Sequence, residues 1–176
     1  MRDTVAAFLV LAATLGVAVL PAHAQPSLVK AEVLKDWAGL KDAMMKIADA
    51  MPEDKFAYKS TPAQRSYGEQ ILHVANINLA VLGSIGGKAT APAINPKATA
   101  KAEILKAMSD SFDYGTTVIN EQTADTFFQV VKARFLGEST RSRVFYFLAG
   151  HTWDIYGQMA VYLRLNGIVP PASVRP

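Results

Sequence analysis

Apolar residues recur at spacings of three and four along most of the chain, which is the pattern of amphipathic helices. The first such stretch runs from Leu28 to Met51, with Ser27 as its predicted N-cap and Pro52 directly after its end. Its apolar face comprises Leu34, Trp37, Leu40, Met44, Ile47 and Met51. This regularity predicts one long helix.

A second helix is predicted from Ser66 to about Ile85. Ser66 and Glu69 stand three residues apart, as in a capping box, in which each side chain binds a backbone N–H of the first turn. The segment is apolar nearly all round, which predicts deep burial. Gly86-Gly87 ends it, and residues 86–98 form a long connection.

A third helix is predicted after Thr99, its expected N-cap. Its apolar stripe comprises Leu105, Met108, Phe112, Gly115 and Ile119. A glycine in a helix costs about 1 kcal/mol relative to alanine, so Gly115 indicates either close packing or space left for a ligand.

The fourth helix is predicted to begin near Ser139 or Thr140 and to end at Asn166-Gly167, since glycine is typical just past a helix end. Residues 122–138 before it are less regular and fit a short helix or an extended piece. No alternating run rich in Val, Ile and Thr supports a sheet. The predicted fold class is therefore all-α, a four-helix bundle.

The N-terminus has the features of a secretory signal. Residues 5–20 are uncharged and apolar but fall short of the roughly 20 residues of a membrane span. Ala22-His23-Ala24 fits the small-x-small site of a signal peptidase. We therefore expect a signal peptide at 1–24, a single domain at 25–176, and an exported protein, periplasmic or secreted, with no membrane segment after cleavage. The alternative is an uncleaved N-terminal anchor.

Composition excludes several functions. The chain has 18 Lys plus Arg against 15 Asp plus Glu, and a net charge of +3 without a basic run does not indicate a nucleic-acid partner. The absence of cysteine excludes disulfides, thiolate metal sites and a cysteine nucleophile. Any metal must therefore be held by histidine, carboxylate or other oxygen ligands.

Two histidines remain after the signal, and both fall on predicted helices. His151 lies along the apolar stripe of the fourth helix, and His73 lies beside Ile77 and Ala80, with Glu69 one turn earlier. An inward-facing histidine on each of two helices is how metal sites in helical bundles are made. The alternative is a pair of core histidines that bind a backbone carbonyl or a carboxylate.

A third ligand is needed to complete such a site. Asp154 is the candidate, because it follows His151 by three residues and lies about 60° away round the helix. Two histidines and one carboxylate suit iron, zinc, nickel or manganese. The alternative is an Asp154 carboxylate in solvent or in a salt bridge. The residues expected to line the pocket are Glu69, Ile77, Ala80, Ile155, Gln158 and Tyr162.

A second group of charged residues precedes and opens the fourth helix. It comprises Lys132, Arg134, Arg141 and Arg143. These side chains fit either a patch for an anionic group or a solvated end of the bundle.

Two segments carry a further signal: the stretch from His151 to Ser173, which begins HTWDIYGQ, and the stretch SYGEQILH, which ends at His73. The first resembles the last-helix signature of the DinB-like family, and the second resembles that family's second-helix motif. The likeness covers about residues 28–173. It implies a four-helix bundle of up-up-down-down topology that is often dimeric, here a homodimer. It also implies a divalent metal held by three histidines, one on the second helix and two spaced by four on the fourth.

His73 and His151 match the first two of these ligands, and Ile155 stands where the third is expected. Either Asp154 replaces that histidine, or the metal binds weakly, or the site has lost it. Some relatives are thiol-dependent S-transferases or related metal-assisted enzymes. The first hypothesis is therefore an exported metal-assisted transferase or hydrolase that acts on a small-molecule substrate.

Two hypotheses without a metal remain. One is a binding or structural module that keeps the bundle and the dimer surface. The other is a carrier that holds a small apolar molecule in the space beside Ala80, Ser84 and Gly115.

Overall fold

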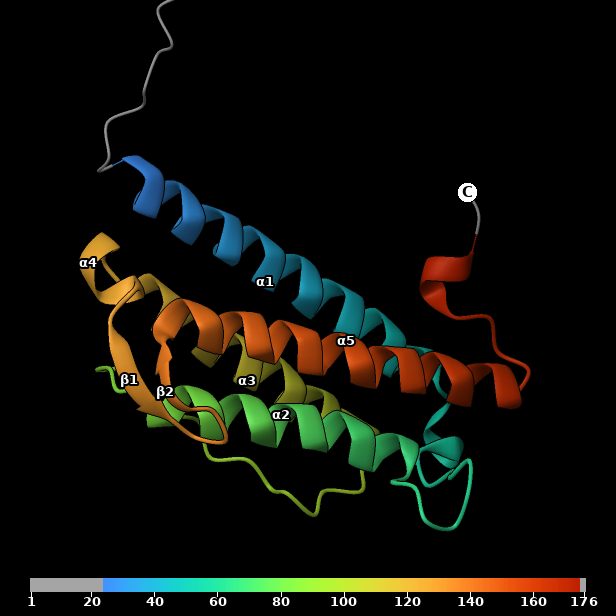
Figure 1. Ribbon diagram of the computed structural model, residues 1–176. Helices are drawn as coiled ribbons and strands as arrows, with labels where there is room; N and C mark the ends of the chain where they lie inside the picture. Colours follow the sequence, from blue (N-terminus) through green and yellow to red (C-terminus); the bar gives the residue numbers. More distant parts are fainter. Residues whose placement is uncertain (1–23, 175–176) are drawn as a thin grey trace, which may run out of the picture.

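The computed structural model describes residues 24–174 and is mostly helical (Figure 1). Its body consists of four long helices: α1 (Ala24–Ala50), α2 (Tyr67–Ser84), α3 (Lys101–Asn120) and α5 (Arg141–Leu165). Helix α1 packs against α3 and α5, and α2 packs against the same two helices, so that all four enclose one core. The all-α prediction is therefore right for the body of the fold.

Five short elements complete the chain: η1 (Glu53–Lys55), α4 (Ala124–Phe127), β1 (Val130–Ala133), β2 (Gly137–Thr140) and η2 (Pro171–Ser173). The strands β1 and β2 pair antiparallel as a hairpin. The expectation that the chain has no sheet is thus wrong at this one place. Each strand has four residues, of which one is buried, so its alternation is too short to detect.

Contacts between side chains fix the direction of each long helix. Near the start of both α2 and α3, Gly68 lies against Ile104, since a Cβ built on Gly68 would be 3.0 Å from the Ile104 side chain. Further along both helices, Asn78 donates a hydrogen bond to Ser111 at 3.3 Å. The two helices therefore run parallel. From α1 to α3, Lys41 pairs with Asp113 and Lys101 with Asp49, so these two run antiparallel.

Helix α5 is antiparallel to α2, because Gln70 is bonded to Gln158 and His73 to His151. The four long helices therefore follow an up-down-down-up order, and the predicted up-up-down-down topology is wrong. The reason is the long connection between α2 and α3, which runs back along the bundle (Figure 1). It returns the chain to the end at which α2 began, so α3 repeats the direction of α2.

Helix starts were predicted with mixed success. The capping box at α2 is confirmed: the Ser66 side chain accepts from the Glu69 N–H at 3.2 Å, and Glu69 accepts from the Ser66 N–H at 2.6 Å. Thr140 caps α5 as expected. The other two caps are wrong, because α1 begins upstream of Ser27 and the N-cap of α3 is the residue after Thr99, without a side-chain bond.

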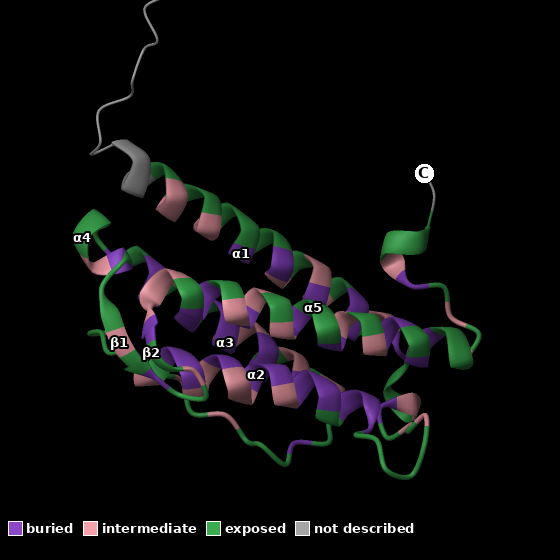
Figure 2. Cartoon of the chain, in the orientation of Figure 1, coloured by how far each residue is buried: buried purple, intermediate pink, exposed green. Residues whose placement is uncertain are grey.

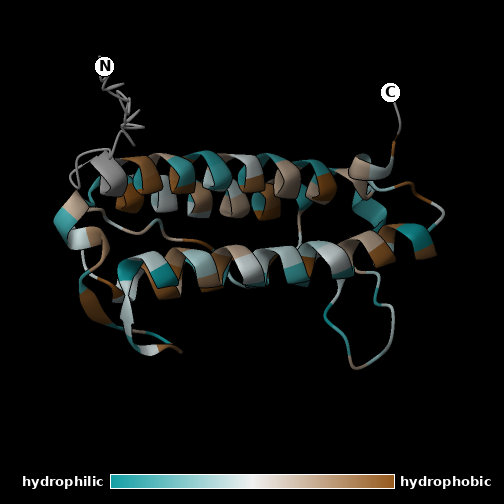
Figure 3. Cartoon of the chain, turned by 45° about the horizontal axis from the view of Figure 1, so that its top comes forward, coloured by the Kyte–Doolittle hydropathy of each residue, from teal (hydrophilic) through white to brown (hydrophobic). Residues whose placement is uncertain are grey.

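The core forms where the four helices face one another (Figure 2). Hydrophilic and hydrophobic positions follow one another along the helices (Figure 3). Trp37 crosses from α1 to α3, where its ring centroid is 4.9 Å from that of Phe112 and its Nε1 donates to the Phe112 carbonyl at 2.9 Å. A Cβ at Gly115 would overlap the Trp37 indole. Gly115 therefore serves close packing and leaves no space for a carried ligand.

The predicted signal peptide lies outside the described residues, apart from its last residue, Ala24. Within residues 24–174, no helix has both the length and the apolar character needed to cross a membrane.

Candidate functional site between α2 and α5

The two histidines meet between α2 and α5. The Nε2 atoms of His73 and His151 are 3.1 Å apart, and the ring centroids are 5.0 Å apart with 64° between the ring planes. Both side chains are half-buried. Two bonds of about 2.0–2.1 Å to one ion require the nitrogens to lie within roughly 4.2 Å of each other. The predicted pair of facing imidazoles is present, and its spacing is compatible with one shared ion.

Flanking contacts along the same helices hold the pair in register. One turn before His73, Gln70 donates to Gln158 at 2.8 Å. One turn earlier again, the ring centroid of Tyr67 lies 6.2 Å from that of Tyr162. Antiparallel helices place residues that are three or four apart in matching rows, so these contacts fix the rotation of both helices. The histidines consequently face each other without a loop between them.

Both imidazoles are neutral at neutral pH. Burial, with smaller contributions from the charge of Arg65 and from His151, lowers the pKa of His73 to about 4. Burial also lowers the pKa of His151, against the opposing charge of Asp154. Neutral imidazole has one N–H and one free lone pair, so one ring donates to the other. Neutral rings are also the form that binds a metal ion.

The third ligand does not join the pair. The Asp154 side chain is exposed, and its Oδ2 accepts a hydrogen bond from Gln158 at 3.1 Å. Among residues 24–174, no group of three or more His, Asp or Glu side chains is close enough to hold one ion. Ile155, which is 2 % exposed, belongs to the apolar core. The residues therefore fit a cation held by two imidazoles and do not fit a cation held by three protein ligands.

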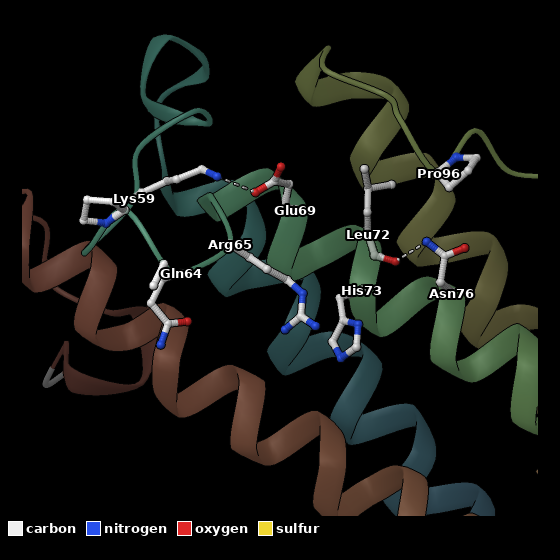
Figure 4. A pocket seen from close by; sticks show the side chains of 10 residues that line it. Lys59, Gln64, Arg65, Glu69, Leu72, His73, Asn76 and Pro96 are labelled. Atoms are coloured by element: carbon white, nitrogen blue, oxygen red, sulfur yellow. Dashed lines mark hydrogen bonds and ion pairs between the residues drawn. The ribbon is translucent and has the colours of Figure 1, made fainter. Parts of the chain in front are cut away.

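A polar pocket of about 450 Å³ opens on one side of His73 (Figure 4). Its lining comprises Lys59, Pro62, Ala63, Gln64, Arg65, Glu69, Leu72, His73, Asn76 and Pro96. Of the predicted pocket residues, the structure places Glu69 here. The pocket thus lies mainly between α2 and the connection that precedes it.

The other predicted pocket residues lie elsewhere. Ile77 and Ala80 are half-buried on later turns of α2, and Ile155 is in the core. Gln158 is engaged with its two polar neighbours, and the Tyr162 hydroxyl donates to the Arg65 carbonyl at 2.8 Å. Tyr162 therefore does not line the pocket but holds the backbone of Arg65, which does.

Sequence reasoning missed the cationic wall of the pocket. Lys59 and Arg65 belong to the connection between α1 and α2, where hydrophobic periodicity gives no signal. The one available signal was the position of Arg65, directly before the capping box of the helix that carries His73.

Of the basic residues near the start of α5, Arg141 and Arg143 make local hydrogen bonds. Arg141 donates to the Thr126 carbonyl and to the Gln129 side chain, both at 3.2 Å, which ties α5 to the segment around α4. Lys132, Arg134 and Arg143 are exposed. This arrangement matches a solvated end of the bundle.

Fold and site together define a helical bundle with a histidine pair between two antiparallel helices and a polar pocket beside His73. A family model described as the DinB superfamily matches residues 37–159, more than half of the chain. The chain belongs to the DinB superfamily, and the family resemblance of the sequence is confirmed.

The fold is similar to the crystal structure of a DinB-like protein from Bacillus cereus, with a TM-score of 0.64 and 18 % sequence identity. The match covers 79 % of this chain and 93 % of that chain. At this identity the likeness concerns the fold alone. A comparison with curated proteins found no match.

Proposed function

We propose that this chain is an exported DinB-superfamily protein that binds one divalent cation between His73 and His151. Zinc, nickel, iron and manganese are the candidates, because imidazole suits each of them. The observation that carries the proposal is the 3.1 Å separation of two neutral imidazole nitrogens beside an open polar pocket. The protein would supply two ligands, His73 and His151, which would leave room on the cation for water or a small-molecule substrate.

A bound divalent cation lowers the pKa of a water or thiol that ligates it, which is the step that a metal-assisted hydrolase or transferase needs. The chain's own residues bind and orient. His73 presents its imidazole at the pocket, and Gln70 and Gln158 fix the helix rotation that aims both rings. Tyr162 holds the backbone of Arg65 in the pocket wall.

A second candidate function is a binding module without a metal. Two observations favour it. The histidines form a hydrogen bond with each other, which satisfies one nitrogen of each ring without an ion. An aliphatic side chain, Ile155, stands where the family resemblance implies a third ligand. In that case the same pocket binds a small molecule, and the histidine pair stabilises the packing of α2 on α5.

Elemental analysis separates the two candidates. Mature protein purified without a histidine tag should contain close to one divalent ion per chain, or take one up from zinc, nickel, iron or manganese salts. His73→Ala and His151→Ala should each remove most of that binding. Asn76→Ala, which changes a pocket residue outside the pair, is the matched control and should keep it. Absence of binding for all four metals rejects the metal site and favours the binding module.

We propose in addition that the chain forms a homodimer through the outer face of α5. Tyr146, Trp153 and Val161 are exposed there by 82 %, 50 % and 49 %. Gly150 and Gly157 lie between them, and a Cβ at either would meet nothing within 4 Å, so the chain's own packing does not require glycine. Light scattering should give twice the mass of one chain, and Trp153→Glu should reduce the measured mass to that of a single chain.

A further inference from the structure

Arg65 lines the pocket together with His73. It is the residue before the N-cap of α2, and its carbonyl is fixed by the Tyr162 hydroxyl at 2.8 Å. Its guanidinium points to the same space as the His73 imidazole (Figure 4). Within residues 24–174, no ion pair and no hydrogen bond involves this guanidinium. Its backbone is therefore held in place while its five N–H donors remain available.

The one acidic residue of the pocket is already engaged. Glu69 accepts from the Ser66 N–H at 2.6 Å, and its Oε2 lies 3.4 Å from the Lys59 ammonium. These contacts lower the pKa of the Glu69 carboxyl, so it stays ionised and paired. The pocket then holds two cations, Lys59 and Arg65, against one carboxylate, next to a neutral imidazole. The net charge of these three side chains is therefore +1, and it resides on Arg65.

We propose that Arg65 binds the substrate by an oxyanion, a carboxylate or phosphate group, next to His73. The planar guanidinium matches both groups with two parallel N–H donors, and such charge-assisted hydrogen bonds are about twice as strong as neutral ones. The inference rests on the proposed function in assigning this oxyanion to the substrate of the histidine site. Arg65 can bind the oxyanion without a metal cation on the histidines.

A cation on the histidines would add positive charge beside the same space. By linkage, cation and oxyanion then raise each other's affinity by the same factor. A neutral or cationic substrate would gain nothing from this arrangement. The pocket therefore selects a small molecule that carries an anionic end.

The test uses mature protein from which metals have been removed by a chelator. Inorganic phosphate and acetate are titrated separately at constant ionic strength, and NMR follows the Arg65 side-chain Nε–H and the backbone N–H of His73. We expect saturable shifts with at least one probe. Arg65→Gln should weaken binding by about tenfold, the scale of a charged hydrogen bond, and Arg65→Lys should give an intermediate loss.

Lys97→Gln is the matched control, because it removes one exposed cation from the neighbouring pocket and should change affinity less than about twofold. Tighter binding of phosphate assigns a phosphate-bearing substrate, and tighter binding of acetate a carboxylate-bearing one. The proposal is overturned if neither probe saturates, or if Arg65→Gln binds as well as the unmodified chain. Because no metal is present, this result is independent of the elemental analysis, and either proposal can fail alone.

Discussion

Ile155 follows His151 by one turn of α5, and its side chain is buried in the core while the imidazole reaches across to α2. This relationship leaves the histidine pair without a third nitrogen ligand on the same helix. It is the point at which the chain departs from the three-histidine set that its family resemblance implies.

Ile155→His should strengthen zinc binding by at least about tenfold, because a third imidazole ligand adds to the two already present. The same change should lower the free energy of unfolding of the metal-free protein by about 2 kcal/mol or more, since a polar ring replaces a buried aliphatic side chain. Competition with a chromophoric chelator measures the first effect and chemical denaturation the second. Ile155→Asn is the control, and unchanged affinity in Ile155→His would show that residue 155 cannot reach the ion.

The histidine pair should make the metal-free protein sensitive to acid. Above about pH 6.5, His73 is neutral in both the folded and the unfolded chain and has no effect. As the pH falls towards about 4, the unfolded chain takes up a proton that the folded chain does not, because burial lowers the pKa of folded His73 to about 4. The free energy of unfolding should therefore decrease over this window.

Chemical denaturation across that range checks the effect, and His151, whose pKa is also lowered by burial, contributes in the same direction. His73→Gln removes one of the two titrating groups and should flatten the pH dependence. An equal slope in His73→Gln and in the unmodified chain would contradict the assignment.

Replacement of two glycines by alanine should change the free energy of unfolding in opposite directions. Gly115→Ala should destabilise the fold by about 1–3 kcal/mol, because a methyl group there overlaps the Trp37 indole. Gly39→Ala in α1 should stabilise the fold by up to about 1 kcal/mol, since a Cβ added at this position would meet nothing within 4 Å and alanine favours the helix. Thermal denaturation of both variants is the measurement. A gain in stability from Gly115→Ala would mean that the indole can move aside.

The start of α2 depends on the capping box, whereas the start of α3 does not depend on Thr99. Ser66→Ala should reduce the free energy of unfolding by about 0.5–2 kcal/mol, because it removes the acceptor for the Glu69 N–H. Thr99→Ala should change it by less than about 0.5 kcal/mol, since Thr99 is exposed and the N-cap of α3 is the next residue. Equal losses in the two variants would contradict the difference between the caps.

Much of the fold was predictable because helical periodicity and caps are local signals. The buried face of α1, with Met44 and Ile47, and the box at Ser66 follow from residues three or four apart. The order of helix directions was not predictable in this way. The length of the connection between α2 and α3 permits either direction, and the contact between Asn78 and Ser111 that decides it joins residues 33 positions apart.

The same distinction between local and long-range signals applies to the candidate site. His73 and His151 could be found because each lies on the inward face of a helix. The position of Asp154 could not be decided, because a residue about 60° from His151 can turn to the core or to solvent. In the structure Asp154 is exposed and accepts a hydrogen bond from Gln158. Arg65 lies in a connection, where only the folded chain shows which residues line the pocket.

The two imidazoles are 78 positions apart along the polypeptide. In the unfolded ensemble they are separated by a long flexible segment, so a molecule that needs both rings finds them together only after the chain has folded. Anything held by both rings therefore shifts the equilibrium towards the native state as its concentration rises. The melting temperature then becomes a direct and label-free reporter of occupancy, suitable for screening metal salts and small anions in the same assay.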